Sequence, residues 1–225
     1  MPTDSLFARI VEARDHPDDV FWHYVMMRDP YWKHLGEAQR RKVMHDSVHC
    51  GSQSAGYFSD VRLPIRTLCA DAGIQISICE DVPQSNREIF ALFEAPSTIR
   101  LRPDLIQETQ AKLDTAEYRA LLGTFQLEDV MLAHELFHFL ERIHKKTIYT
   151  QTEKTTTISI GPIHVRKRLT MSSEVAAMAF VQSLLGLPWN PYLLDAIIVS
   201  RTDPQATDGI LTTWQTLREQ HRKGT

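Results

Sequence analysis

His134-Glu135-Leu136-Phe137-His138 lies inside an apolar stretch, from Leu127 to about Lys145, whose pattern predicts an α-helix. Successive residues of a helix are turned by about 100°, so positions i and i+4 differ by only about 40°. His134 and His138 therefore project from one face of the predicted helix, and Glu135 lies about 100° from His134. Unpaired histidine and glutamate side chains are costly in an apolar helix, which indicates that these three residues act together.

The spacing of the three residues is the H-E-x-x-H pattern, in which two imidazoles on one helix face bind one cation. A zinc ion bound there lowers the pKa of a water molecule toward about 7. Glu135 is close enough to take the proton of that water as it attacks a polarised amide carbonyl. We therefore predict that His134 and His138 bind Zn2+ and that Glu135 is the catalytic general base.

A catalytic zinc ion also needs a third protein ligand and an open position, and two residues compete for this role. His144 stands ten residues after His134, as in the longer signature H-E-x-x-H-x-x-G-x-x-H. Glu141 occupies the position at which that signature has glycine to turn the chain back. If the helix continues instead, His144 lies about 80° from His134 and too far along the helix axis.

Glu174 is the second candidate for the third ligand. It leads an otherwise apolar face of a predicted helix that runs from Ser173 to Leu185. Such a carboxylate either caps the helix or points toward a buried group. Alanines in the first half of this helix would let it pack closely against the H-E-x-x-H helix. We favour Glu174 as the third ligand. The alternative is a metzincin-like protease that uses His144 as its third ligand.

Two further motifs follow the pentapeptide, namely Glu174-x-x-Ala177-x-x-Phe180 and Leu184-Leu185-x-x-Pro188. With the pentapeptide they resemble the ImmA/IrrE family of zinc metallopeptidases, and the resemblance covers about residues 60–190. The resemblance implies His134, His138 and Glu174 as zinc ligands and Glu135 as general base. It also implies a substrate, because family members often cleave or inactivate a DNA-binding repressor.

The chain departs from the family pattern in the distance between the ligands. Here 36 positions separate His138 from Glu174, and a threonine-rich insertion at 146–170 fills the gap. Its composition is typical of an extended β-hairpin or of a flap beside the cleft.

We expect an α+β fold in which a small, mostly antiparallel three-stranded sheet packs with a zincin-type active-site helix and a second ligand helix. Residues 74–78 alternate apolar and polar side chains, which predicts a strand. Two more strands are expected at 89–93 and 98–101, and residues 94–97 suit a hairpin turn.

The expected organisation has three parts. Residues 1–58 form a helical N-terminal addition, 59–190 the metallopeptidase-like core with its insertion, and 191–225 a helical C-terminal segment. The turn-rich stretch Gly51–Gly56 is a plausible break near the first boundary.

Composition limits the classes of partner. The 225-residue chain has a formal net charge of −3, which gives no electrostatic reason to expect direct nucleic-acid binding. The three cysteines are widely spaced, and no apolar run is long enough to span a membrane. We expect a cytoplasmic protein whose partner is a protein or peptide substrate.

Two other functions stay open, a non-catalytic zinc-binding regulator that acts by binding a partner and a zinc hydrolase with a non-peptide substrate. Glu141 stands seven residues after His134 and almost eclipses it on the helix, so it is either an acceptor that orients an imidazole or a solvated residue at the helix end. Weaker candidates are a second histidine pair and two possible donors to an oxyanion in the insertion. These are His45 with His49, and Tyr149 with His164. We expect the aromatic residues Trp22, Tyr24, Tyr31 and Trp32 to belong to the core or to an interface and not to a ligand platform.

Overall fold

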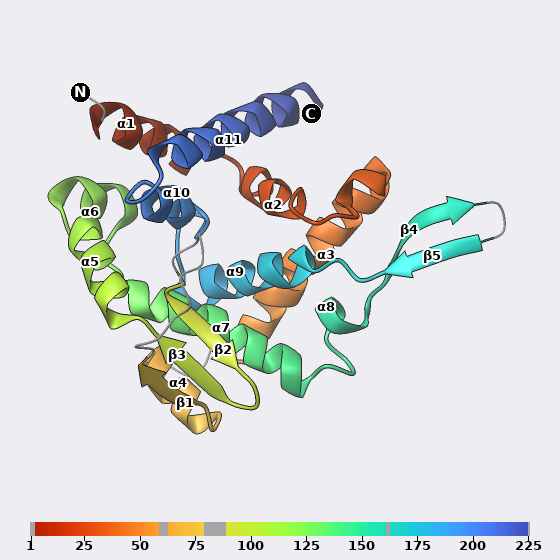
Figure 1. Ribbon diagram of the computed structural model, residues 1–225, viewed down its shortest axis with the longest axis horizontal. Coiled ribbons are helices and arrows are strands. Elements are labelled where there is room, and N and C mark those ends of the chain that lie inside the picture. Colours follow the sequence, from red (N-terminus) through yellow and green to blue (C-terminus); the bar gives the residue numbers. More distant parts are fainter. Residues whose placement is uncertain (1–2, 59–62, 79–88, 161–162, 225) are drawn as a thin grey trace.

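The computed structural model of the chain describes residues 3–58, 63–78, 89–160 and 163–224 (Figure 1). Helices predominate, and a three-stranded sheet and a two-stranded hairpin complete the expected α+β fold. The helices are α1 (Thr3–Arg14), α2 (Asp18–Met26), the short 3-10 helix η1 (Trp32–His34), α3 (Glu37–Gly56), α4 (Ile65–Asp71), α5 (Pro103–Leu113), α6 (Ala116–Leu122), α7 (Leu127–Ile143), α8 (Tyr149–Thr152), α9 (Met171–Leu185), α10 (Leu193–Val199) and α11 (Pro204–Gly224). The strands are β1 (Gln75–Ile78), β2 (Ala91–Glu94), β3 (Thr98–Leu101), β4 (Thr155–Ile160) and β5 (Ile163–Lys167).

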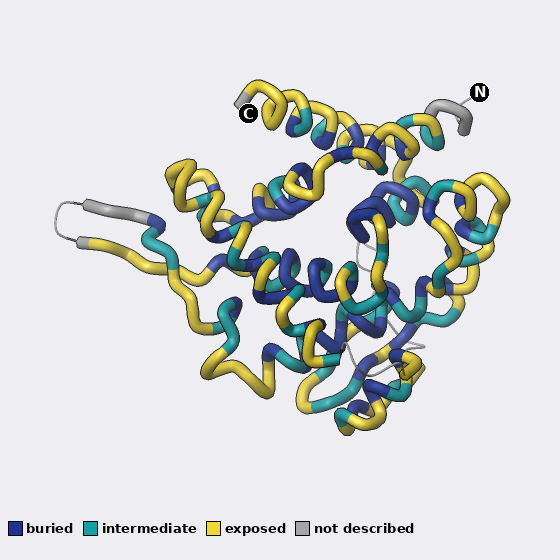
Figure 2. The backbone as a smooth tube through the Cα atoms, turned by 180° about the vertical axis from the view of Figure 1, so that it is seen from behind, coloured by how far each residue is buried: buried dark blue, intermediate teal, exposed yellow. Residues whose placement is uncertain are grey.

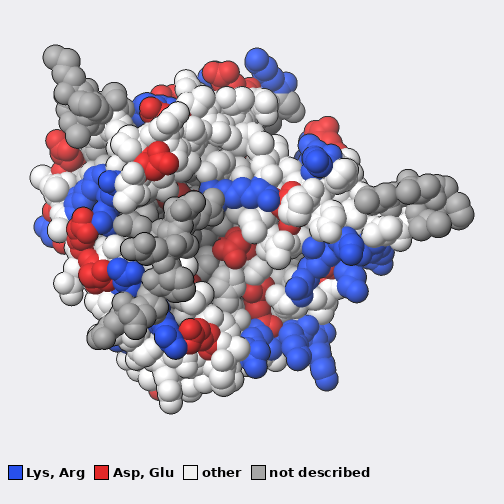
Figure 3. Space-filling view, in the orientation of Figure 1, with Lys and Arg blue, Asp and Glu red and all other residues white. Residues whose placement is uncertain are grey.

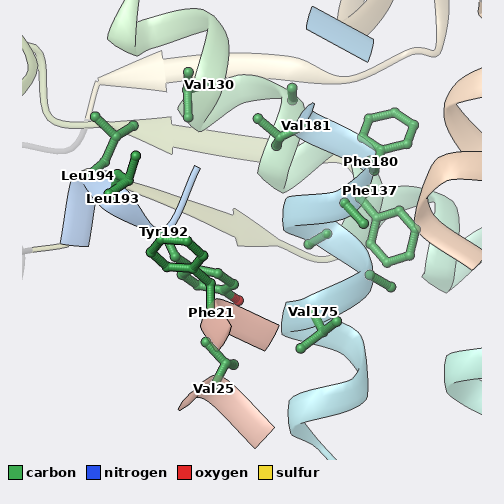
Figure 4. Close-up of a cluster of buried hydrophobic side chains, with 14 of the residues drawn as sticks. Phe21, Val25, Val130, Phe137, Val175, Phe180, Val181, Tyr192, Leu193 and Leu194 are labelled. Atoms are coloured by element: carbon green, nitrogen blue, oxygen red, sulfur yellow. The ribbon is translucent and has the colours of Figure 1, made fainter. Parts of the chain in front are cut away.

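Helix α7 lies at the centre of the molecule, where it packs against both α9 and strand β2. Figure 2 shows that α7 and α9 are buried along much of their length. Phe137 of α7 and Phe180 of α9 are fully buried, and their ring centroids lie 5.6 Å apart (Figure 4). The two helices expected to carry the ligands are therefore joined by the main hydrophobic core.

Helix α3 runs along α9 and is longer than its sequence indicates. The break expected at Gly51–Gly56 is wrong, because the helix continues to Gly56. Gly51 is buried, and a Cβ atom built on it would lie 2.0 Å from the carbonyl oxygen of Ala176. Glycine at this position permits close approach of two helix backbones and does not mark a turn.

The three-stranded sheet is mixed, which corrects the expectation of a mostly antiparallel sheet. Strands β2 and β3 form the expected antiparallel hairpin, with Ala91 opposite Leu101 and Glu94 opposite Thr98. Strand β1 pairs in parallel with β3, so the order is β1-β3-β2. The chain therefore passes from one edge of this sheet to the other before it returns to the centre. Strand pairing of this kind depends on distant parts of the chain, and the local pattern does not encode it.

The threonine-rich insertion forms a β-hairpin, one of its two expected structures. It starts with the short helix α8 and continues as antiparallel strands β4 and β5, with Thr155 opposite Lys167. Figure 1 shows this hairpin extending away from the body of the molecule. It connects the two helices expected to carry the ligands, because it follows α7 and precedes α9.

The N- and C-terminal helices pack together, since α11 contacts α1, α2 and α10, and α2 also contacts α9. Trp22 and Trp32 are buried and Tyr24 and Tyr31 partly buried, which confirms the core role expected for these aromatic residues. Within the described part of the chain, no helix has the length and apolar character needed to cross a membrane. Cys50 and Cys69 are buried free thiols, and Cys79 lies outside the described residues.

Candidate metal centre

Helix α7 places both histidines of the H-E-x-x-H motif on the face toward α9. Its opposite faces carry fully buried apolar side chains, which fix the rotation of the helix in the core. The Nε2 atoms of His134 and His138 lie 3.1 Å apart, and both side chains are partly exposed. The two imidazoles therefore converge on one point, as the spacing predicts.

Glu174, in the first turn of α9, completes a three-residue group with these histidines. Its Oε2 lies 3.5 Å from His134 Nε2, and its Oε1 lies 3.8 Å from His138 Nε2. One ligand atom from each residue lies within 4.8 Å of the others. Within the described residues this is the group of histidine, cysteine and acidic side chains that could hold a metal ion.

The start of α9 is fixed by a residue from the N-terminal part of the chain. The sequence predicts that this helix begins at Ser173, but α9 already begins at Met171. Asp29, just after α2, accepts hydrogen bonds from the Met171 N–H at 3.2 Å and from Thr170 Oγ1 at 3.3 Å. Its carboxylate thus acts as the cap from a distance in sequence and fixes the turn that carries Glu174.

Glu141 is an acceptor that orients an imidazole, and this imidazole is that of His138. Its Oε2 accepts hydrogen bonds from His138 Nδ1 at 2.9 Å and from Ser173 Oγ at 2.5 Å. Its Oε1 accepts from Thr150 Oγ1, and from Gln151 Nε2 at 3.3 Å. Glu141 is only 4% exposed, so it is a buried carboxylate that joins α7, α8 and α9 at the candidate metal centre.

The two histidines differ in the contacts of their second ring nitrogen, Nδ1. His138 Nδ1 contacts Glu141, whereas His134 Nδ1 is buried without a hydrogen-bond partner among the described residues. Burial alone would lower the pKa of His134, but its contact with Glu174 and the charge of Glu135 raise it to about 9. Burial would raise the pKa of Glu174, but its contact with His134 and nearby positive charges lower it to about 2. The carboxylates therefore favour a positive charge at the point where the ligands meet.

Glu135 points toward the sheet, about 100° around α7 from His134. The Oε2 atom of Glu135 accepts a hydrogen bond of 2.8 Å from the Phe93 N–H of strand β2. Glu135 is buried, with 8% of its surface exposed. Phe139 packs edge-on against the Phe93 ring, with centroids 6.1 Å apart, and strengthens this contact between helix and strand. Glu135 is thus adjacent to the ligand pair without belonging to the ligand group.

The remaining predicted residues lie elsewhere. His144 follows the end of α7, is exposed and does not belong to the ligand group. His45 and His49 stack on the exposed side of α3, with ring centroids 6.3 Å apart. Tyr149 is partly buried, and burial first, and then the negative charges of Asp46 and Glu153, raise its pKa. His164 is exposed on strand β5.

The structure adds neighbours that no sequence pattern indicated. Arg28 donates to the Tyr24 hydroxyl at 2.5 Å and lies 3.4 Å from Asp195 Oδ2. Tyr192 is 4% exposed, and its hydroxyl has no hydrogen-bond partner among the described residues (Figure 4). Burial first, and then the negative charge of Glu174, raise the pKa of Tyr192 well above its ordinary value. Arg28 follows α2, and Tyr192 and Asp195 lie at the start of α10, so none of them belongs to α7 or α9.

Comparison of the chain with family models, with curated proteins and with solved structures gives no match. The geometry of the ligand group and of the residues that support it is therefore the evidence from which a function can be inferred.

Proposed function

We propose that the protein is a zinc-dependent metallopeptidase that hydrolyses peptide bonds of specific protein substrates. The observation that carries this proposal is the convergence of His134, His138 and Glu174 on one point, with Glu135 beside them. Two imidazoles and one carboxylate are a donor set typical of catalytic zinc sites, which keep a fourth position open.

The distances within the ligand group fit a tetrahedral zinc ion. Zinc bonds to nitrogen and oxygen are about 2.0–2.2 Å long, so two ligand atoms at a tetrahedral angle lie about 3.3–3.5 Å apart. The observed separations are 3.1 Å between the imidazole nitrogens, and 3.5 and 3.8 Å between these nitrogens and the Glu174 oxygens. The two Glu174 contacts are made by different oxygens, so binding through a single oxygen would need the carboxylate to turn, within a group whose ligand atoms already lie within 4.8 Å of one another.

Each surrounding residue then has a definite role. Zinc, when bound, supplies a Lewis acid that polarises a carbonyl group and acidifies water. Glu135 Oε2 is held by the Phe93 N–H, which leaves Oε1 to accept the proton of the attacking water. Glu141 accepts the Nδ1 proton of His138, which leaves Nε2 of that ring free for the metal.

The position of strand β2 supports a peptide as the substrate. In the three-stranded sheet β2 is an edge strand, and its Phe93 N–H already points toward Glu135. An extended peptide can add to such an edge by main-chain hydrogen bonds, which would place its carbonyl groups beside α7. The resemblance to the ImmA/IrrE family makes a DNA-binding repressor the first protein substrate to test.

The catalytic role of Glu135 is tested on a synthetic peptide library, in which new termini are detected by mass spectrometry. We expect zinc-loaded wild-type protein to produce new termini, and Glu135→Gln to reduce their rate at least about a hundredfold. The matched control is Glu117→Gln, which makes the same change at an exposed position of α6 and should keep full activity. Full activity of Glu135→Gln would show that the mechanism is wrong.

The ligand set is tested by metal analysis of purified variants. Glu174→Ala should lose bound zinc, whereas His144→Ala should keep it, because His144 lies outside the ligand group. The opposite result would favour the metzincin-like ligand set. A third outcome would indicate a non-catalytic regulator. In that case the protein binds zinc through Glu174 but cleaves no peptide or repressor, and its effect in cells survives the change Glu135→Gln.

A further inference from the structure

The chain segment that connects the two ligand helices is strongly basic. Between Arg142 and Arg168 it contains seven lysine and arginine residues and one acidic residue, Glu153. The whole chain has a formal net charge of −3, so this segment is positively charged whereas the rest of the protein is acidic. We call these seven side chains the basic patch. They are Arg142, Lys145, Lys146, Lys154, Arg166, Lys167 and Arg168.

All residues of the basic patch are exposed. Figure 3 shows lysine and arginine atoms gathered around the base of the β4–β5 hairpin and the end of α7. Arg166 lies 3.6 Å from Glu153. By contrast, the side chains of Lys145, Lys146 and Lys167 have no hydrogen-bond or ion-pair partner among the described residues. Much of the positive charge of the patch is therefore available to a partner.

The basic patch is also connected to both sides of the candidate metal centre. Arg142 follows His138 by one turn of α7, which is about 6 Å along the helix axis. Arg168 precedes Met171, the first residue of α9, on which Glu174 lies. In Figure 3 the basic atoms lie beside a hollowed part of the same face, where acidic atoms are visible. A partner bound to the patch would thus lie next to the ligand group.

We propose that the basic patch docks an acidic segment of the protein substrate and so directs a neighbouring peptide bond to the metal centre. This proposal rests on the proposed peptidase function. Complementary charge speeds association and rejects partners that carry the wrong charge, which gives the enzyme a means of selecting its substrate.

An acidic protein segment suits this surface better than a nucleic acid does. A nucleic-acid backbone carries a continuous row of phosphates, and its binding depends on neutralising many of them along an extended surface. Beyond the basic patch, such a backbone would meet the partly exposed carboxylate of Glu174 and a chain that is acidic overall. A short acidic peptide segment can occupy the patch alone.

The proposal is tested by fluorescence anisotropy with a labelled peptide of alternating glutamate and serine. The protein is Glu135→Gln, used with and without zinc, so binding is measured whether or not the protein is a peptidase. We expect binding that weakens steeply between about 0.05 M and about 0.3 M salt. Lys145→Glu with Lys146→Glu should weaken it at least about fivefold, and Lys145→Arg with Lys146→Arg should preserve it.

The matched control reverses the same number of charges at Arg222 and Lys223, which are exposed in the last turn of α11. This control should bind the acidic peptide like the parent protein. Equal binding by the Lys145→Glu, Lys146→Glu variant would overturn the proposal. It would also be overturned if a short DNA duplex of matched charge bound more tightly than the peptide through the same two lysines, because the partner would then be a nucleic acid.

Discussion

The two ligand helices and the hairpin that connects them differ in almost every physical property. Helices α7 and α9 are largely apolar and buried, and they pack against each other, with α3 along α9. Strands β4 and β5 extend from the molecule and carry exposed basic side chains. The ligand geometry therefore comes from helix packing, and the length of the connection has little influence on it.

This difference explains how 36 positions can separate His138 from Glu174 without separating their side chains. The entropy cost of closing a loop grows only slowly with its length, so an insertion between packed helices is tolerated. The buried helices can fix the metal centre, while the exposed hairpin is free to vary in length and charge. The predictions below test this division, from the largest expected effect to the smallest.

The largest effect is expected where α3 approaches α9. Gly51→Ala places a Cβ atom 2.0 Å from the Ala176 carbonyl oxygen, so the two helices must move apart. Overpacking against a rigid backbone should lower the free energy of unfolding by about 3 kcal/mol or more, as measured by urea denaturation. The matched control is Gly56→Ala in the same helix, where a Cβ atom meets nothing within 4 Å.

Gly56→Ala should leave stability unchanged or raise it slightly, because alanine favours helix more than glycine does. Equal stability of the two variants would show that α3 and α9 are not packed as closely as the structure indicates.

Zinc should stabilise the fold by joining α7 to α9. A ligand that binds only the folded state at a hundred times its dissociation constant adds about 2.7 kcal/mol. Urea denaturation with and without zinc should show this gain for wild type and for His144→Ala, and Glu174→Ala should lack it. If Glu174→Ala keeps the gain, zinc does not join α9 to α7 through this carboxylate.

The stability of the metal-free fold and the affinity of the protein for zinc should depend on pH with opposite signs. The pKa of His134 is raised from 6.5 to about 9, so its contact with Glu174 stabilises the metal-free fold below pH 6.5 and loses its effect as pH rises through about 9. Glu174, whose pKa is lowered from 4.5 to about 2, contributes above pH 4.5 and loses its effect toward pH 2.

Zinc must displace the proton of His134, so its affinity should rise up to about tenfold per pH unit between pH 6.5 and 9. Competition with a chelating dye measures this slope. A zinc affinity that is independent of pH over this range would contradict the role of His134 as a ligand that must lose a proton before it binds zinc.

Glu141→Gln should weaken the metal centre without removing a ligand. The amide removes the negative charge that holds the Nδ1 proton of His138 and disturbs the contacts with Ser173 and Thr150. Replacing such a supporting residue typically costs about 10–100-fold in metal affinity, measured here by dye competition. Glu117→Gln is the control and should bind zinc like wild type. Unchanged affinity in Glu141→Gln would mean that this carboxylate only supports the fold.

Sequence alone predicted the parts of the fold that depend on local periodicity. The α7 helix, the α9 helix and the β2–β3 hairpin follow from residues close together in the chain. The sequence also indicated Glu174, because a lone carboxylate on an apolar face is itself a signal, and Glu141, because it stands seven residues after His134. The proposed roles of these residues stay predictions that the variants above can test.

The parts that sequence did not predict depend on distant contacts. A glycine such as Gly51 is typical both of a turn and of a place where two helices cross closely. Only the contact with Ala176 distinguishes these two structures. The parallel pairing of β1 with β3 and the capping of α9 by Asp29 also join segments far apart in the chain. Arg28 and Tyr192 were missed for the same reason, since no local pattern marks a side chain contributed from another helix.

The smallest effect is expected in the hairpin. Replacing residues 156–166 with Gly-Ser-Gly shortens the connection between the paired positions Thr155 and Lys167, which already lie opposite each other. The change should alter the free energy of unfolding by less than about 1 kcal/mol, because the shorter loop offsets part of the lost strand pairing. Zinc affinity should stay within about twofold of wild type, since α7 and α9 position the ligands. Loss of zinc binding in a variant that still folds would show that the hairpin, and not helix packing alone, fixes Glu174 beside the histidines.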